Sequence, residues 1–263
     1  MLLSLDSATS GLENFQQEIN VIANNIANVN TTGFKEADVD FADTLSQTIG
    51  TSAASTSQVG TGVTTASITN NFSAGSITST GVTSDLAING NGFFVVKDPT
   101  SGNSYVTQDG SFTVDSSGYL VTSGGQRLQG TAGDIQISAG SSSTATVSSY
   151  SVSSTGLVTV NLSDGTSTTS QITIQDYSNP DELVKVGGNL YTATTAAGGL
   201  AAAVNPGSSG TGTLESGYLE SSNVDLATQL TDLITAQRAY EANSKVVTTS
   251  DTMLQTLINM KQG

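Results

Sequence analysis

The stretch LDSATSGLENFQQEINVIANNIANV, residues 5–29, decides the architecture of this chain. Residues 1–30 contain no proline and only one glycine, Gly11, so little interrupts a helix there. The apolar residues are spaced alternately by three and four positions, as in a helix that packs against other helices. They are Leu5, Ala8, Leu12, Phe15, Ile19, Ile22, Ile26 and Val29. The pattern predicts a helix over residues 1–33, which ends at Gly33 in the left-handed backbone conformation.

The other end of the chain repeats this organisation. No glycine or proline occurs from Asn223 to Lys261, which predicts a helix over residues 222–263 with Ser222 or Asn223 as its N-cap. The negative charge of Asp225 near the start of this helix interacts favourably with the helix dipole. Its apolar residues form two stripes, and so wide a face needs more than one partner helix. The first stripe is Leu226, Leu230, Leu233, Tyr240, Val247, Leu254 and Ile258, and the second is Ala236, Ala239, Val246, Met253, Leu257 and Met260.

An amphipathic helix at each terminus cannot bury its apolar stripe on itself. The two helices therefore pair, either as a two-stranded coil or within a helical layer built from several copies of the chain. A helical hairpin that buries only itself is the simpler alternative, although one partner would leave part of the wide C-terminal face exposed. We expect subunit contacts at Leu5, Leu12, Phe15, Ile19, Ile22, Ile26, Val29, Leu226, Leu230, Leu233, Tyr240, Val247, Leu254 and Ile258.

Polar residues of the N-terminal helix have two readings. They form either a solvated face or hydrogen bonds between subunits and to a lumen. These residues are Asn14, Gln16, Asn20, Asn24, Asn25 and Asn28.

The region between the helices is a pattern of short strands and turns. Residues 34–75 are expected to be a linker with extended β structure beside the helices, and residues 76–221 a β-rich outer body. The predicted fold class is α+β. A discontinuous β-rich body of short strands and hairpins is combined with long terminal helices, 1–33 and 222–263, that pair as a coiled-coil-like inner domain.

Turn signals divide the β-rich region further. Asp109-Gly110, Ser117-Gly118 and Asp164-Gly165 predict hairpin turns. Residues 138–155 are dominated by Ser, Thr and Ala, and they predict a loop or an edge-strand meander. Residues 196–213 predict a flexible linker back to the terminal helix.

The composition excludes several classes of function. The formal net charge is −15, so nucleic acid and anionic membrane surfaces are poor partners. The chain has neither cysteine nor histidine, which removes thiol chemistry, the commonest general base and the commonest zinc ligand. We therefore expect no enzyme, no cofactor and no metal site. With 7 basic against 22 acidic residues, contacts between copies have to rest on apolar packing and neutral hydrogen bonds.

Targeting signals are equally sparse. No stretch approaches the roughly 20 apolar residues of a membrane helix. The first residues carry no basic segment and reach Asp6 at once, unlike a cleaved secretion signal. We expect a chain that is cytosolic or exported with its N-terminus intact.

Functions of two other classes remain as alternatives. A Ser/Thr-rich surface adhesin fits the composition, but it should show an internal repeat, and none of fixed period is found. A carbohydrate-active enzyme would need paired carboxylates. It would also be expected to have aromatic side chains on which a sugar ring stacks, and the chain has no tryptophan. The segment Gly90-Asn91-Gly92 is no phosphate loop, because no Lys-Ser/Thr follows it.

Five segments resemble motifs of the bacterial flagellar hook and rod proteins. They read ANNIANVNTTGFK (23–35), LAINGNGFFV (86–95), YVTQDGSF (105–112), SGYLESSNVDL (216–226) and ITAQRAYEANSK (234–245). Gln108 stands where the family usually has arginine. The resemblance is good over residues 1–130 and 180–263 and weak over 131–179. The residues that carry it are Asn24, Asn25, Asn28, Gly33, Phe34, Gly90, Gly92, Phe93, Phe94, Asn223, Gln237, Arg238 and Tyr240.

The resemblance implies a structural subunit of the flagellum. Members are exported unfolded by the flagellar type III apparatus, which agrees with an uncleaved N-terminus. They polymerise into a helical tube with the paired terminal helices inside and the β domains outside. The implied partners are other copies of the chain, neighbouring rod, hook and junction proteins, the export apparatus and the cap.

Two members of the family fit the chain. Residues 41–43, 70–75 and 223–226 look more like hook protein, whereas residues 238–241 and the short body look more like distal rod protein. We expect a hook subunit with a minimal outer domain, and a distal rod subunit is the alternative.

Overall fold

The computed structural model describes residues 2–52, 55–138, 146–198, 203–208 and 210–262. The chain divides into two compact units. The helical unit comprises residues 1–28, 36–71 and 224–263, and the sheet unit comprises residues 29–35 and 72–223.

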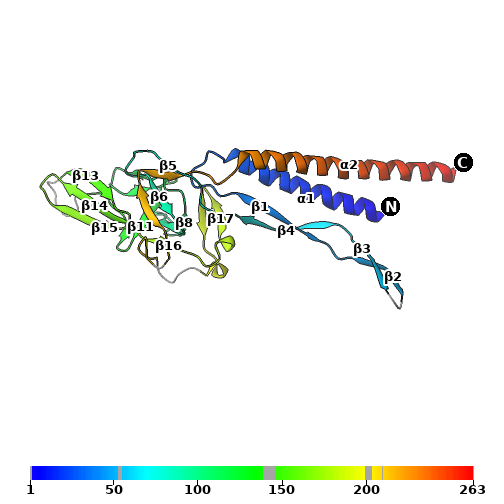
Figure 1. Cartoon of the computed structure of the whole chain (residues 1–263), viewed down its shortest axis with the longest axis horizontal. Helices are drawn as coiled ribbons and strands as arrows, with labels where there is room; N and C mark the ends of the chain where they lie inside the picture. Colours follow the sequence, from blue (N-terminus) through cyan, green and yellow to red (C-terminus); the bar gives the residue numbers. More distant parts are fainter. Residues whose placement is uncertain (1, 53–54, 139–145, 199–202, 209, 263) are drawn as a thin grey trace. The chain divides into compact units, whose positions relative to one another are not determined.

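Two antiparallel helices, α1 (Leu2–Ala27) and α2 (Leu226–Gln262), lie side by side in the helical unit (Figure 1). Beside α1, β1 (Ala37–Asp43) pairs antiparallel with β4 (Val63–Asn70), and we call this pair the ribbon. β2 (Gln47–Ser52) pairs antiparallel with β3 (Ser55–Val59). The helix α1 therefore packs on α2 and on the ribbon.

Both predicted helices are shorter in the structure. α1 ends at Ala27 rather than at residue 33. Gly33 does have left-handed backbone, with φ of 63°, but it lies in the sheet unit. α2 begins at Leu226, and its cap is Asp225, whose Oδ1 accepts a hydrogen bond of 2.8 Å from Ala227 N. Neither Ser222 nor Asn223 is the N-cap, because a carboxylate sits nearer the first free amides.

The sheet unit carries a nine-stranded sheet in the order β17-β18-β8-β7-β11-β10-β9, with β12 on β11 and β16 on β7. Its strands are β7 (Phe93–Lys97), β8 (Ser104–Thr107), β9 (Thr113–Val114), β10 (Leu120–Val121), β11 (Arg127–Gly130), β12 (Gly133–Asp134), β16 (Ile174–Gln175), β17 (Val184–Gly187) and β18 (Leu190–Thr192).

A three-stranded sheet, two strand pairs and two short 3₁₀ helices complete the described part of this unit. The three-stranded sheet is β13 (Val147–Val152), β14 (Leu157–Leu162) and β15 (Ser167–Gln171). The pairs are β6 (Leu86–Asn89) with β19 (Thr213–Ser216), and β5 (Ile77–Ser79) with β20 (Tyr218–Glu220). The 3₁₀ helices are η1 (Pro180–Glu182) and η2 (Thr195–Ala197).

Apolar residues of these strands fill two cores. The larger core includes Phe94, Phe112 and Ile172, and the rings of Phe94 and Phe112 meet edge to face at 5.2 Å. The smaller core includes Phe93 and Tyr191. Adjacent residues 93 and 94 point into different cores because successive side chains of a strand face opposite sides.

The predicted turns have mixed outcomes. Ser117-Gly118 joins β9 to β10, and Asp164-Gly165 joins β14 to β15, so both hairpins are confirmed. The hairpin at Asp109-Gly110 is wrong, since β8 pairs with β7 and β18 and not with β9. Gly110 is instead a place of close backbone contact. Leu86 N donates to its carbonyl at 3.0 Å, and a Cβ at position 110 would lie 1.6 Å from Leu86 O.

The α+β class is confirmed by two long terminal helices and a β-rich body. Within the predicted loop or meander at 138–155, β13 is an edge strand, and residues 139–145 lie outside the described residues. Residues 199–202 and 209 of the predicted linker also lie outside them.

Candidate assembly interface

The seam between α1 and α2 contains small and polar residues beside apolar ones. On α1, Ala8, Ile22 and Asn25 are buried. On α2, the buried or half-buried seam residues recur every seven positions, which is a heptad repeat. They are Gln229, Ala236, Asn243 and Ser250. Small and polar side chains are therefore combined in this helix pair with the buried Ile22 and with half-buried leucine and valine residues of α2.

Two contacts give the register of this helix pair. Gly11 lies so close to Asn243 that a Cβ on Gly11 would be 2.9 Å from its Nδ2. Farther along, Asn25 Nδ2 donates to Gln229 Oε1 at 3.1 Å. The two contacts are 14 residues apart on each helix, from Gly11 to Asn25 on α1 and from Gln229 to Asn243 on α2. At this register Leu2 lies opposite Thr252, so the last residues of α2 have no α1 residue beside them.

A buried polar network fixes that register. Asn25 is 1% exposed and Gln229 is 3% exposed. Besides its bond to Gln229, Asn25 exchanges two hydrogen bonds with the backbone of Ala37, at 2.9 and 3.1 Å. Gln229 Nε2 in turn donates to Glu36 Oε1. A shift of either helix would leave these groups buried without partners, which costs about 1–3 kcal/mol for each.

The ribbon holds α1 from its other side. Asn14 Nδ2 donates to Val63 O at 2.9 Å, and Thr65 Oγ1 donates to Asn14 Oδ1 at 2.7 Å. Ser10 Oγ accepts from Val63 N at 3.3 Å, and the rings of Phe15 and Phe41 meet edge to face at 5.9 Å. Asn14 and Asn25 therefore bind within their own unit, a role that sequence reasoning missed.

The predicted subunit-contact residues divide into two groups. Ile22 is buried and the others on α1, with Val29 just beyond it, are half-buried. On α2, Leu233, Val247 and Leu254 are half-buried. The rest are exposed to 36–55%, namely Leu226, Leu230, Tyr240 and Ile258.

Large apolar side chains remain uncovered along α2. Besides the four just named, Ile234, Val246, Met253, Leu257 and Met260 are 42–74% exposed. We call these nine residues the α2 stripe. Ile234 belongs to it although the predicted stripes omitted it. So many exposed large apolar side chains along one helix indicate an interaction site.

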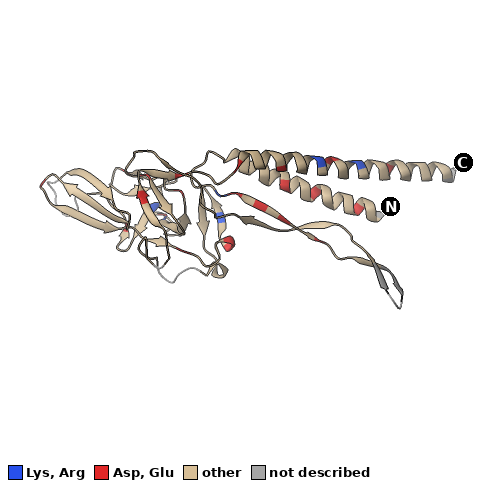
Figure 2. Ribbon diagram, in the orientation of Figure 1, with Lys and Arg blue, Asp and Glu red and all other residues tan. Residues whose placement is uncertain are grey.

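Acidic residues gather where α1, β1 and α2 meet. A cavity of about 100 Å³ there is lined by Glu18, Asp38, Gln229 and Asp232, among others. Burial raises the pKa of Glu18, and the charge of Asp232 raises it further. Burial likewise raises the pKa of Asp38 and of Glu36, with added repulsion from neighbouring carboxylates that include Asp232. Figure 2 shows the acidic bands on α1 and along the ribbon.

In the sheet unit, the two terminal motifs meet at a buried ion pair. Lys35 is 0% exposed and Glu220 is 4% exposed, and Lys35 Nζ lies 2.8 Å from Glu220 Oε1. Lys35 Nζ also donates to Ser73 O at 2.8 Å, and Glu220 Oε1 accepts from Gly75 N at 2.7 Å. Gly33 N donates to Glu220 O at 2.9 Å. We call this arrangement the Lys35–Glu220 clasp.

The other motif residues are distributed over both units. Phe34 is buried, and Asn223 Nδ2 donates to Ser73 Oγ at 3.1 Å. Gly90 and Gly92 lie in the turn between β6 and β7, before the buried Phe93 and Phe94. On the helices, Asn24, Gln237, Arg238 and Tyr240 are exposed, and Asn28 Nδ2 donates to Asn24 O at 2.9 Å. The family motifs therefore include residues buried in the sheet unit as well as exposed residues on α2.

Two further searches of the described residues bear on other functions. They contain no group of three or more Asp or Glu side chains arranged to hold a metal ion. No helix in the described part of the chain is long and apolar enough to cross a membrane.

Comparisons with known proteins agree along the whole chain. Residues 5–35 match the family "Flagella basal body rod protein", 87–160 "Flagellar hook protein FlgE/F/G D1 domain" and 215–260 "Flagellar basal body rod FlgEFG protein C-terminal". The chain is 43% identical to the flagellar basal-body rod protein FlgG of Bacillus subtilis and 38% identical to that of Borreliella burgdorferi, with 100% of both chains covered in each comparison. It is also 43% identical to the flagellar hook protein FlgE of Borreliella burgdorferi, but over 49% of this chain and 31% of that protein.

Full-length identity at this level, together with family matches at both termini and in the body, establishes the relationship. The chain belongs to the family of flagellar basal-body rod and hook proteins, and it is a structural subunit of the flagellar axis.

Proposed function

We propose that this chain is a subunit of the distal rod of the flagellar basal body, and that it polymerises through its terminal helices. Sequence analysis favoured the hook, with the rod as the alternative. The similarities support the rod better, because they cover both chains completely for the basal-body rod proteins and only part of each for the hook protein. No catalytic step is part of the proposal.

The α2 stripe carries the assembly part of this proposal. Its residues are 36–74% exposed, so each retains part of the roughly 1.5–3 kcal/mol that full burial of such a side chain contributes. The seam with α1 does not use them, and the end of α2 runs beyond α1. In a tube built from repeated subunits, other copies of the chain would cover the α2 stripe, with the paired helices α1 and α2 as an inner layer and residues 76–221 outside.

The wider setting follows from the same family membership. We propose that the chain is exported through the flagellar type III apparatus without a cleaved signal, and that it contacts neighbouring rod, hook and junction proteins and an assembly cap. In this arrangement the half-buried contact residues on α1 touch neighbouring helices only with the part of each side chain that is exposed in the monomer.

A charge placed in the stripe tests the assembly mode. Leu230→Asp should leave the monomer folded, since Leu230 is 48% exposed, but it should abolish polymers in sedimentation, because burying an unpaired charge costs several kcal/mol. Thr168→Asp on the exposed surface of β15 is the matched control and should polymerise normally. Normal polymers from Leu230→Asp would contradict the proposal.

Complementation tests rod against hook. The chain should restore flagella in a Bacillus subtilis strain that lacks its basal-body rod protein FlgG, and it should fail in a strain that lacks its hook protein. The opposite result would return the hook as the better assignment.

A further inference from the structure

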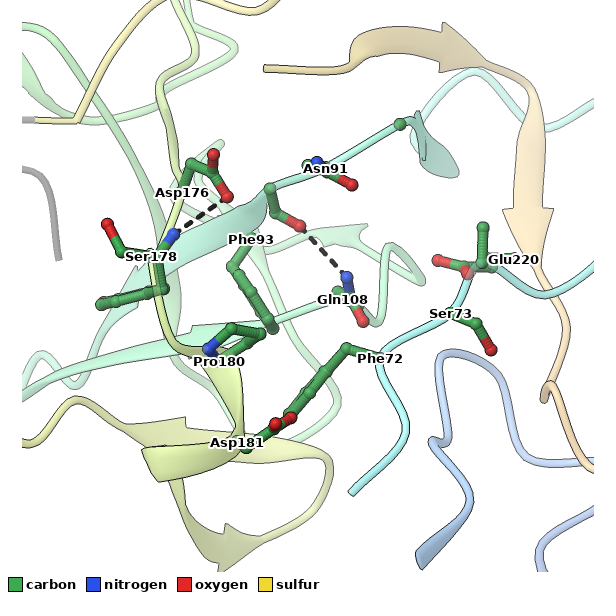
Figure 3. A pocket seen from close by; sticks show the side chains of 14 residues that line it. Phe72, Ser73, Asn91, Phe93, Gln108, Asp176, Ser178, Pro180, Asp181 and Glu220 are labelled. Atoms are coloured by element: carbon green, nitrogen blue, oxygen red, sulfur yellow. Dashed lines mark hydrogen bonds between the residues drawn. The ribbon is translucent and has the colours of Figure 1, made fainter. Parts of the chain in front are cut away.

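A cavity of about 450 Å³ lies in the sheet unit, and the assembly interface does not use it (Figure 3). Small-molecule sites commonly have volumes of about 300–1,000 Å³. Its walls come from the segment before β5, the turn between β6 and β7, the end of β8, and the loop that leads into η1. All of these segments belong to one compact unit, so the cavity is complete within it.

One wall of the cavity is Gln108, a buried amide with an unpartnered oxygen. Its side chain is 8% exposed, and Nε2 donates to Gly92 O at 3.2 Å. That bond fixes which end of the amide is the oxygen. Oε1 is buried and has no hydrogen-bond partner in the described chain. In Figure 3 the oxygen of Gln108 lies on the side of Phe72 and Ser73. A ligand that donates a hydrogen bond would satisfy it.

The charge of the walls is negative. Asp176, Asp181 and Glu220 line the cavity, and no lysine or arginine is among its described lining residues. Glu220 is partly compensated by Lys35 in the clasp, and Asp176 Oδ1 accepts from Tyr177 N at 2.9 Å. Asp181 is exposed on η1 at the rim. The ligand should therefore be a cation.

Aromatic rings form the remaining wall. The rings of Phe72 and Phe93 meet edge to face at 5.4 Å, and those of Phe93 and Tyr177 at 5.6 Å. Among cations, a guanidinium group suits such a surface best, because it is planar, weakly hydrated and stacks on rings. Its several donors also point in different directions within one plane, so a guanidinium group donates to more than one acceptor at once.

We propose that this cavity is a binding site for a guanidinium group, with Gln108 Oε1 as a buried acceptor and with the carboxylates of the rim as counter-charges. The site does not depend on polymerisation. It is therefore tested on the full-length monomer, and its outcome is separate from that of the assembly proposal.

The test is an NMR titration of the isotope-labelled monomer with N-ethylguanidinium. The side-chain amide of Gln108 and the backbone amides around Gly92 should shift and saturate. Ethylammonium and the neutral ethylurea are the matched probes, and each should bind at least about tenfold more weakly, which corresponds to about 1.4 kcal/mol. Equal binding of ethylammonium at the same resonances would overturn the guanidinium assignment.

Variants locate the site. Gln108→Leu keeps the approximate size and removes the acceptor, so the affinity for N-ethylguanidinium should fall at least about tenfold. Gln136→Leu is the control, because Gln136 Nε2 donates to Ser117 O and does not line the cavity. If Gln108→Leu alters the fold, Asp181→Asn at the exposed rim should still weaken binding. Unchanged affinity in both variants would refute the proposal.

The source of the guanidinium is separated by two further probes. Arginine with both ends capped imitates a side chain of another polypeptide, and free arginine represents a metabolite. Binding of the capped form alone would support a polypeptide side chain as the ligand, and equal binding would support a free small molecule. Failure of both to bind would overturn the proposal.

Discussion

In the sheet unit, Leu86, Phe94 and Ile172 are 0% exposed, whereas in the helical unit Ile234, Leu257 and Met260 are 52%, 50% and 74% exposed. The first unit has two buried cores of large apolar residues, although valines such as Val184 and Val186 stay 55% exposed. The second combines alanine, asparagine, glutamine and serine with the buried Ile22 in its internal seam, and it leaves the nine residues of the α2 stripe exposed. The contrast separates a body with its own buried cores from a helix pair whose large apolar side chains stay partly exposed.

The largest effect should come from the core of the complete unit. Phe94→Ala should lower the free energy of unfolding of the sheet unit by about 3–5 kcal/mol, because it leaves a cavity beside Phe112. Ile234→Ala on α2 is the matched change, and in the monomer it should cost less than about 0.5 kcal/mol. Urea unfolding measures both, and similar losses would remove the contrast between the units.

A comparable loss is expected at the clasp. Lys35→Met should destabilise the sheet unit by about 3–5 kcal/mol, because it leaves Glu220 charged and buried without its cation. The double variant Lys35→Met with Glu220→Leu should recover most of that loss. Urea unfolding of the two variants checks this, and equal instability would mean that the pair contributes more than charge compensation.

Sequence reasoning found the two helices because large apolar residues mark them, and it found the hairpins at 117–118 and 164–165 because their turns are local. It placed Ala236 in an apolar stripe but missed the rest of the buried face of α2, because Gln229, Asn243 and Ser250 look like solvated positions. Their seven-residue recurrence was the available signal. The wrong hairpin at Asp109-Gly110 has a similar cause, since its glycine serves a contact with Leu86 that is distant in sequence.

A smaller effect is expected in the helical unit at its polar network. Gln229→Leu should lower the stability of the helix pair by about 1–3 kcal/mol, since it removes the partner of Asn25. Hydrogen exchange should rise along α1 and α2, while the sheet unit stays protected. Gln237→Leu at an exposed position of the same helix is the control. Unchanged exchange in Gln229→Leu would show that the network does not hold the register.

The two units should respond to acid in opposite directions. The raised pKa values of Glu18, Glu36 and Asp38 mean that the folded helical unit favours their protonated forms. Its stability should therefore rise as the pH falls from neutrality towards their ordinary values of about 4. In the sheet unit, hydrogen bonds from the Ser101 hydroxyl and the Thr166 hydroxyl lower the pKa of Asp98 and Asp164. Their contribution is present above about pH 4 and is lost below it.

Resonance-by-resonance NMR during urea titrations at several pH values measures both responses. Asp232→Asn should raise the stability of the helical unit at neutral pH and reduce its pH dependence, because Asp232 repels all three carboxylates. A helical unit that loses stability from pH 7 to pH 5 would contradict the prediction.

The Lys35–Glu220 clasp also bears on the order in which the chain folds. Its two side chains are 185 positions apart, and strands β19 and β20 pair with β6 and β5 across similarly long separations. Contacts between such distant residues form late, because a long loop has to close first. In the export proposed above, a chain that left a channel with its N-terminus first would therefore keep its body open until Glu220 emerged. Only the α2 segment would then remain inside, so the body would close just before the helix that is proposed to meet neighbouring copies.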